Sequence, residues 1–229
     1  MASSRSVDRS PVSPTPVEIA ATHLARVAGA GSAHHPHLEI LVEGGRPDSG
    51  RDLADAVHLL CSLHGRHPGL IELALAHIAH DPAHALLAQA ADAFERERLY
   101  LVKLTSAVGP MPSTPGAAET EASLMAQRNA LEILASSERT GCALGAATAL
   151  IGDWATIRRL LDRAAVRTGL ERPEPALPDL DELAGIIGRS GDSANGRAVA
   201  FGGEQLLLQH RALFDLLEAR ASARADWDS

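Results

Sequence analysis

Aromatic side chains are scarce in this chain of 229 residues, at 3% of the sequence. The hydrophobic fraction is nevertheless 45%, so the core must be built from Ala, Leu, Ile and Val. Alanine has the highest helix propensity. Runs that alternate Val, Ile, Thr or Tyr with polar residues are nearly absent, which disfavours strands. The composition therefore predicts an all-α protein.

Lysine and cysteine are also rare. Lys103 is the single lysine, the formal net charge is −8, and Lys and Arg form no cluster. Such a chain neutralises phosphates poorly, so we expect no nucleic-acid partner and disfavour a helix-turn-helix regulator. Cys61 and Cys142 lie far apart and form no metal-binding motif. We expect both to act as small apolar residues.

Long apolar runs are missing as well. The longest candidate, residues 142–151, is far shorter than the ~18 residues that a membrane-spanning helix needs. The N-terminus lacks the apolar segment of a signal peptide. We therefore expect a cytoplasmic protein with no membrane partner.

The chain divides by composition into a long helical region and two short ends. Residues 1–17 hold five Ser and three Pro, which predicts a disordered N-terminal tail. Residues 18–222 are expected to form a single helical-bundle domain, and residues 223–229 a flexible C-terminal end.

Apolar periodicity predicts an up-and-down bundle of four to five main helices with short accessory helices. Gly152 and Asp153 are expected to break the longest one. The predicted helices span approximately residues 17–29, 51–64, 68–80, 81–108, 114–151, 154–167, 179–187 and 197–220, and residues 38–43 form either a helical turn or an extended piece.

Each of four main helices is expected to direct a polar residue toward the core. For example, Glu138 shares a stripe with Leu134 and Cys142, and His210 shares one with Leu206. The candidate ligand-binding residues are His64, Glu97, Arg98, Glu138 and His210.

A lone charge in an apolar interior costs several kcal/mol unless it is paired. We therefore expect these residues to contact one another, with Glu138 buried and paired with His210 or Arg98. Two interpretations stay open: a hydrogen-bond network that fixes helix register, or a ligand, metal or catalytic site.

Two carboxylates and two histidines from four helices resemble the layout of ferritin-like bundles. That resemblance implies a di-iron or di-manganese site built on Glu-x-x-His motifs. Here Cys61 and Leu207 stand where the motifs ahead of His64 and His210 would have Glu. The di-metal motif is not intact, and we predict no metal and no cofactor.

The segments 63–68 (LHGRHP) and 141–145 (GCALG) resemble an uncharacterised all-helical bacterial family. That resemblance implies no activity.

Six of the eleven histidines lie between positions 58 and 84. The pairs His64/His67 and His77/His80 have a spacing that metal sites use, but Gly65, Pro68 and Pro82 interrupt or adjoin them. We expect these histidines to interact with the last carbonyls of helices instead.

The leading functional hypothesis is a non-catalytic helical bundle that acts by self-association or partner binding. Small residues at Gly141 and Gly145 permit close helix packing, within the chain or between copies. The alternative is a ferritin-like protein that binds a metal or small ligand through Glu138, His210, His64 and Glu97, with or without redox activity.

Overall fold

A computed structural model describes residues 13–44, 49–78, 82–139, 141–190 and 193–229, and these residues contain helices but no strand. The all-α prediction is confirmed. Residues 1–12 of the predicted tail, and His80, lie outside the described part of the chain, whereas α1 begins at Pro16, within the expected range of that tail. The elements are α1 (Pro16–Ala30), η1 (Ser32–His34), α2 (Pro36–Glu43), α3 (Ser49–His64), α4 (Leu70–His77), α5 (His84–Ala107), α6 (Ala117–Ala135), α7 (Cys142–Thr168), α8 (Leu180–Ser190) and α9 (Ser193–Trp227).

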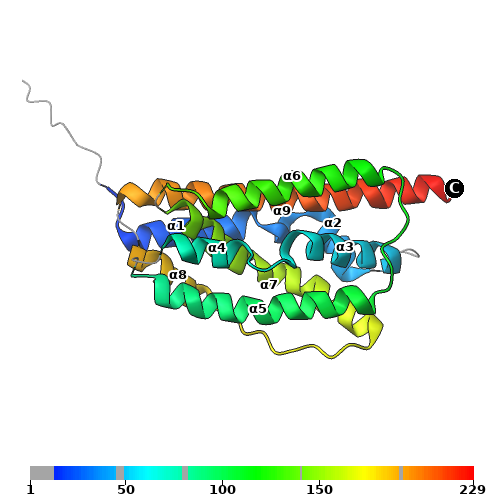
Figure 1. Ribbon diagram of the computed structural model, residues 1–229, viewed down its shortest axis with the longest axis horizontal. Helices are drawn as coiled ribbons and strands as arrows, with labels where there is room; N and C mark the ends of the chain where they lie inside the picture. The colour runs from blue at the N-terminus through cyan, green and yellow to red at the C-terminus, as the bar shows by residue number, and fades with distance from the viewer. Residues whose placement is uncertain (1–12, 45–48, 79–81, 140, 191–192) are drawn as a thin grey trace, which may run out of the picture.

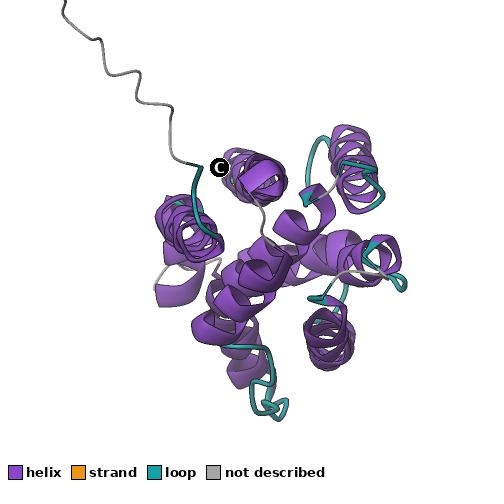
Figure 2. Cartoon of the chain, turned by 90° about the vertical axis from the view of Figure 1, so that its left-hand side faces the viewer, coloured by secondary structure: helices purple, strands orange, loops and turns teal. Residues whose placement is uncertain are grey.

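The helices run up and down along one long axis, and several are seen nearly end-on in Figure 2. The pair α1 and α2 runs in one direction, α3 and α4 return, and α5, α6 and α7 alternate (Figure 1). An extended segment over residues 170–178 then leads back to α8, and α9 runs parallel to α7 (Figure 1). Helix α7 contacts every other α-helix and is the centre of the bundle.

Two of the helical segments that run along the bundle axis, α1–α2 and α3–α4, are interrupted near their middle. Helix α1 ends at Gly31, and Pro36 starts α2, with the His35 ring accepting a hydrogen bond from the backbone N–H of His37 at 3.2 Å. Helix α3 ends at His64, and α4 begins only after Gly69, whose N–H donates to Glu72 at 2.8 Å. Backbone groups and side chains at the two breaks can therefore face the interior.

The predicted helix over residues 114–151 is wrong, because α6 ends at Ala135 and α7 begins at Cys142. Gly141 has φ +91°, a left-handed conformation that favours glycine and lets the chain reverse between the two helices. The predicted break at Gly152 and Asp153 is also wrong, since α7 continues through both residues.

Small residues bring α7 and α9 into close contact. A Cβ placed on Gly145 would lie 2.0 Å from the backbone oxygen of Val199, and one on Gly202 would lie 2.0 Å from that of Cys142. A Cβ on the adjacent Gly203 would lie 2.4 Å from the ring of His23 on α1. The three helices α1, α7 and α9 thus pack at separations that larger side chains would prevent.

The C-terminal end of the bundle is held by ion pairs. Helix α9 extends to Trp227, beyond the expected end near residue 220 and into the segment expected to be a flexible end. Asp55 accepts two hydrogen bonds from Arg220 and one from Arg224, and Arg224 also pairs with Asp52 at 2.7 Å. Among the described helices, none is long and apolar enough to cross a membrane.

Replacing Gly145 with Ala should destabilise the protein by about 1–3 kcal/mol, because the new methyl group meets backbone, which cannot rotate away. Gly185→Ala on α8 is the matched control, since nothing lies within 4 Å of its Cβ position. The control should be stabilising by roughly 0.5–1 kcal/mol through helix propensity. Urea unfolding measures both changes, and equal effects would show that α7 and α9 are not in close contact.

Stability should fall on acidification because of His23. Its Nε2–H donates to Thr148 Oγ1 at 3.0 Å, while that hydroxyl donates to the carbonyl of Leu144. Burial, together with the smaller effect of the nearby Arg26 charge, lowers the pKa of His23 from 6.5 to about 4. The unfolded chain therefore binds a proton that the folded chain does not, so stability is complete above about pH 6.5 and decreases toward pH 4.

The contribution of His23 between pH 7 and pH 5 is about 2 kcal/mol. Denaturant unfolding at both pH values measures it. His23→Gln should have a shallower pH dependence than the unsubstituted protein, and an unchanged slope would contradict the assignment.

Candidate functional site

The structure buries four of the five predicted site residues. His64, Glu97, Arg98 and His210 are all buried, whereas Glu138 is exposed in the turn between α6 and α7. The predicted burial and pairing of Glu138 are therefore wrong. The expected stripe failed because it assumed one continuous helix across residues 136–141.

Only two of these residues contact each other through their side chains. His64 Nε2 lies 3.1 Å from His210 Nε2. Glu97 pairs instead with Arg158 at 2.7 Å, and Arg98 pairs with Glu72 at 2.8 Å. The predicted residues thus form parts of three adjoining interactions, and not one four-residue cluster.

A chain of hydrogen bonds passes through the middle of the bundle. Ser32 donates its backbone N–H to Asp153 Oδ1 at 2.7 Å and its hydroxyl to Oδ2 at 2.5 Å. His210 Nδ1 lies 2.6 Å from Asp153 Oδ2, and His210 Nε2 reaches His64. We call Ser32, Asp153, His210 and His64 the central relay.

The two helix breaks supply both ends of the central relay. Ser32 lies where α1 gives way to α2, so its backbone N–H is free to bind Asp153. His64 is the last residue of α3, and Arg98 Nε donates to its backbone carbonyl at 3.4 Å. Asp153 on α7 and His210 on α9 lie between them, on the closely packed parallel pair.

Electrostatics keep a charge on Asp153 and off His64. Burial alone would raise the pKa of Asp153, but the hydrogen bonds from His210 and Ser32 outweigh burial and hold it below its ordinary value. Burial lowers the pKa of His64 well below its ordinary value, and the nearby charges of His210 and Arg98 act in the same direction. The central relay therefore pairs an ionised carboxylate with a terminal imidazole that stays neutral.

One proton lies between the two Nε2 atoms, because two neutral lone pairs would repel at 3.1 Å. When His210 is neutral, its Nδ1–H donates to Asp153, and His64 donates its Nε2–H to His210. When His210 is protonated, it donates at both nitrogens, and His64 carries its proton on Nδ1. The position of this proton decides whether His64 Nδ1 is an acceptor or a donor.

Trp154 separates the central relay from the Glu97 ion pair. Its indole contacts the His64 ring edge-on, with ring centroids 5.5 Å apart, and its Nε1–H donates to Glu97 at 3.1 Å. Arg158 then binds Glu97 and, at 2.8 Å, Asp162. Glu97 is thus fully engaged in positioning the indole against His64.

A narrow cavity of about 50 Å³ adjoins His64 at the break between α3 and α4. The side chain of His64 is hydrogen-bonded to His210 through Nε2, and no described residue is hydrogen-bonded to its Nδ1. The cavity is lined by Leu63, His64, Arg66, Pro68, Gly69, Leu70, Leu73, Phe94, Arg98, Arg128, Leu131, Glu132 and Leu150. We call it the narrow cavity; none of these lining residues is Ser, Thr, Cys, Tyr or Lys.

Sequence reasoning missed Asp153 and Ser32. The sequence does contain a signal for Asp153. The apolar stripe of Leu134 and Cys142 continues to Ala149. Asp153 lies four residues further along, so one more helical turn places its carboxylate on the inward face. Ser32 has no comparable signal, because its role depends on where the α1–α2 break falls relative to α7.

Two groups of possible metal ligands occur in the described part of the chain, and neither includes a predicted site residue. In the first, His35 accepts a backbone N–H at Nδ1, so its ring proton lies on Nε2 and is donated to Asp215. That nitrogen has no lone pair for a metal.

In the second group, His67, Glu72 and Glu95 all contact the guanidinium of Arg98, which already supplies the positive charge. Neither group forms the layout of ferritin-like bundles, in which carboxylates from facing helices surround the metal ions.

Comparison with known proteins gives one match. A family model described as "Family of unknown function (DUF6975)" matches residues 27–225, a range that contains the whole central relay and every residue of the narrow cavity. No curated protein and no solved structure matches the chain.

Replacing Asp153 with Ala should cost about 3–5 kcal/mol of stability, because it leaves His210 and the Ser32 N–H buried without their acceptor. The exposed acid Glu138 is the matched control, and Glu138→Ala should change stability by no more than roughly 0.5 kcal/mol. Urea unfolding of the two variants measures the difference. Similar values for both would contradict the burial of Asp153 in the central relay.

Proposed function

The chain belongs to the family of unknown function DUF6975, and we propose that it binds a small molecule in the narrow cavity. His64 exchanges a proton with the bound molecule. One observation carries the proposal: a buried chain of hydrogen bonds from Ser32 through Asp153 and His210 ends at an imidazole that lines a cavity. Buried networks that serve the fold alone satisfy their polar atoms within the protein.

The central relay makes His64 a usable base despite its low pKa. In the state in which His210 is neutral, a donor group on the bound molecule gives its proton to His64 Nδ1. The proton on His64 Nε2 then moves to His210 Nε2, so His64 ends neutral and its two nitrogens have exchanged roles. The positive charge resides on His210, 2.6 Å from the Asp153 carboxylate. The ion pair forms where a counter-charge already exists, so no isolated charge develops in the interior.

The lining of the cavity supports binding with proton exchange over covalent catalysis. Its described residues include none of the hydroxyl, thiol or amine nucleophiles that form covalent intermediates. His64 is therefore the group suited to acid–base chemistry, and Phe94, Leu131 and Leu150 make the surrounding wall apolar.

Self-association or partner binding, predicted from the sequence, is less favoured by this geometry. Gly145 packs against Val199 of α9, and Gly141 packs against the same residue. The small residues that motivated the prediction are thus used within the chain, and association with another chain would need a different surface.

Equilibrium dialysis against a protein-free metabolite extract tests the proposal. The unsubstituted protein should enrich at least one small molecule, detected by mass spectrometry, because an open polar end of a buried network favours a hydrogen-bonding ligand. Leu131→Trp and Leu73→Trp, which fill the narrow cavity from two helices, should abolish that enrichment. Thermal unfolding confirms that each variant is folded.

The absence of any enriched compound would overturn the proposal. Enrichment that persists in both folded cavity-filled variants would place binding elsewhere and would overturn it as well.

A further inference from the structure

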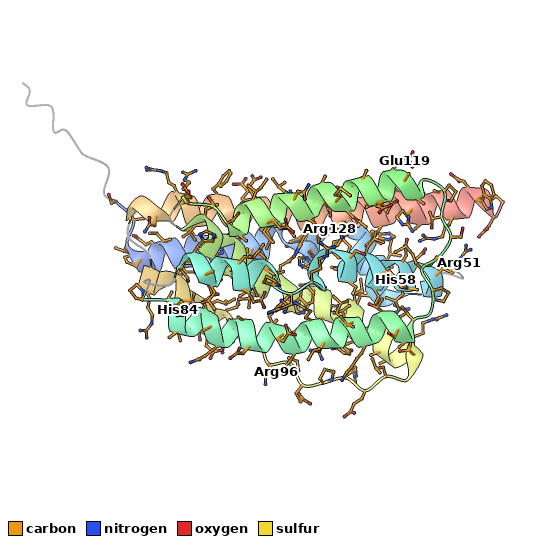
Figure 3. All side chains as sticks on the ribbon, viewed as in Figure 1. Arg51, His58, His84, Arg96, Glu119 and Arg128 are labelled. Atoms are coloured by element: carbon orange, nitrogen blue, oxygen red, sulfur yellow. The ribbon has the colours of Figure 1, made fainter. Side chains whose placement is uncertain are left out.

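A second, wider hollow of about 430 Å³ lies along α6 on the other side of Arg128. Its lining includes Ser62 of α3 and Leu124 of α6, whereas the narrow cavity includes the adjacent Leu63 and His64 and, on α6, Leu131. Arg128 lines both. It lies on the side of α6 that faces α3 and α4 (Figure 3).

From this arrangement we infer that the molecule bound at the proposed site is an organic acid, whose anionic group is held by Arg128. The inference rests on the proposed function and adds the chemical class of the ligand. The body of the acid occupies the wide hollow, and a small donor group extends past Arg128 to His64.

Several arginines line the two hollows. Among them, Arg128 is partly buried and forms no ion pair with a described residue. Arg98 is bound by Glu72 and Glu95, and Arg220 is bound by Asp55. Arg128 makes no hydrogen bond or ion pair with any described residue, although its side chain is partly buried. A guanidinium that is partly removed from water and has no partner attracts a carboxylate or phosphate, which it can bind through two N–H groups.

The other charged residues that line the two hollows leave the guanidinium of Arg128 available to a bound anion. Arg66 adds a second, exposed cation at the narrow cavity. The acids in the two linings are Glu132 and Glu121, both exposed on α6, and neither forms an ion pair with Arg128. A bound anion therefore meets a guanidinium that no protein carboxylate occupies.

The sizes of the two hollows favour an acid with an apolar body. About 50 Å³ admits only a few atoms, so most of the molecule must lie in the wide hollow. That hollow offers Met111, Ala117 and Leu124 as apolar surface, next to the hydroxyls of Thr114 and Thr120. An apolar body with a negative group at one end matches this distribution.

Matched acids and amides test the inference. Salicylate, mandelate and 2-hydroxyhexanoate, each of which carries a hydroxyl donor beside its carboxylate, are compared with salicylamide, mandelamide and 2-hydroxyhexanamide, which keep the size and the hydroxyl and lose the charge. Binding is followed by NMR of the ¹⁵N-labelled His64 ring and by isothermal titration calorimetry. At least one acid should shift the His64 signals and bind about tenfold or more tightly than its amide, the factor expected for one charge-assisted contact.

Charge-matched variants separate the role of Arg128 from a general effect of charge. Arg128→Gln should remove the preference for acids, whereas Arg159→Gln, which deletes an exposed charge on α7 outside both hollows, should leave it unchanged. Glu132→Gln should tighten acid binding several-fold, because it removes a nearby negative charge.

The outcomes distinguish failure of the inference from failure of the proposed function. If amides shift His64 as well as acids do, or if Arg128→Gln keeps the preference for acids, the acid assignment is overturned and the binding site at His64 stands. If no probe shifts the His64 signals, both are overturned.

Discussion

The ionised carboxylate of Asp153 is the constraint on which the middle of the bundle depends. A buried carboxylate is tolerated only when hydrogen bonds and opposite charge replace water. Ser32 can supply its backbone N–H only because α1 ends beside Asp153 of α7. His210 reaches Asp153 only because α9 lies close to α7. The break between α1 and α2 and the glycines of the α7–α9 contact are therefore parts of one arrangement.

Two buried ionic networks fix α9 along its length, and they differ in how they end. Near the C-terminus, Asp55 is enclosed by Arg220 and Arg224, and Thr114 and Thr120 accept further N–H groups. That network serves the register of α3 against α9; it leaves the buried Arg224 Nε without a partner among the described residues, and Arg220, Thr114 and Thr120 line the wide hollow. The central relay begins at Ser32 and ends at His64 beside the narrow cavity, where no described residue is hydrogen-bonded to Nδ1.

Interactions around the open end hold His64 in place without using its free nitrogen. Arg98 binds the backbone carbonyl of His64, and Trp154, fixed by Glu97, packs against the ring. The imidazole thus has a defined orientation, a neutral resting state and a route for its proton toward Asp153. Together with the unmatched charge of Arg128, these features favour a bound acid that also donates a hydrogen bond.

Composition and periodicity were sufficient to predict the all-α class, most helix positions and the burial of His64, of His210 and of one of Glu97 and Arg98, both of which are buried, because these depend on local propensity and on which face of a helix is apolar. The same reasoning placed Glu138 inside, since periodicity continues across a short turn and does not show where the chain reverses. It identified Asp153 only as part of a helix break, because the effect of a glycine and an aspartate on a helix depends on what packs against them.

Only the tertiary structure decided which buried groups meet. Ser32, His64, Asp153 and His210 come from four segments, and their contacts depend on the level of two helix breaks and on the parallel packing of α7 with α9. Whether Arg128 has a partner is likewise decided by the positions of Arg98, Arg220 and their acids on four other helices. The sequence by itself thus determined the helical class and the burial of side chains on regular helix faces, because these are properties of each helix, whereas the turn at Glu138 and the pairing of buried groups depend on how the helices are arranged.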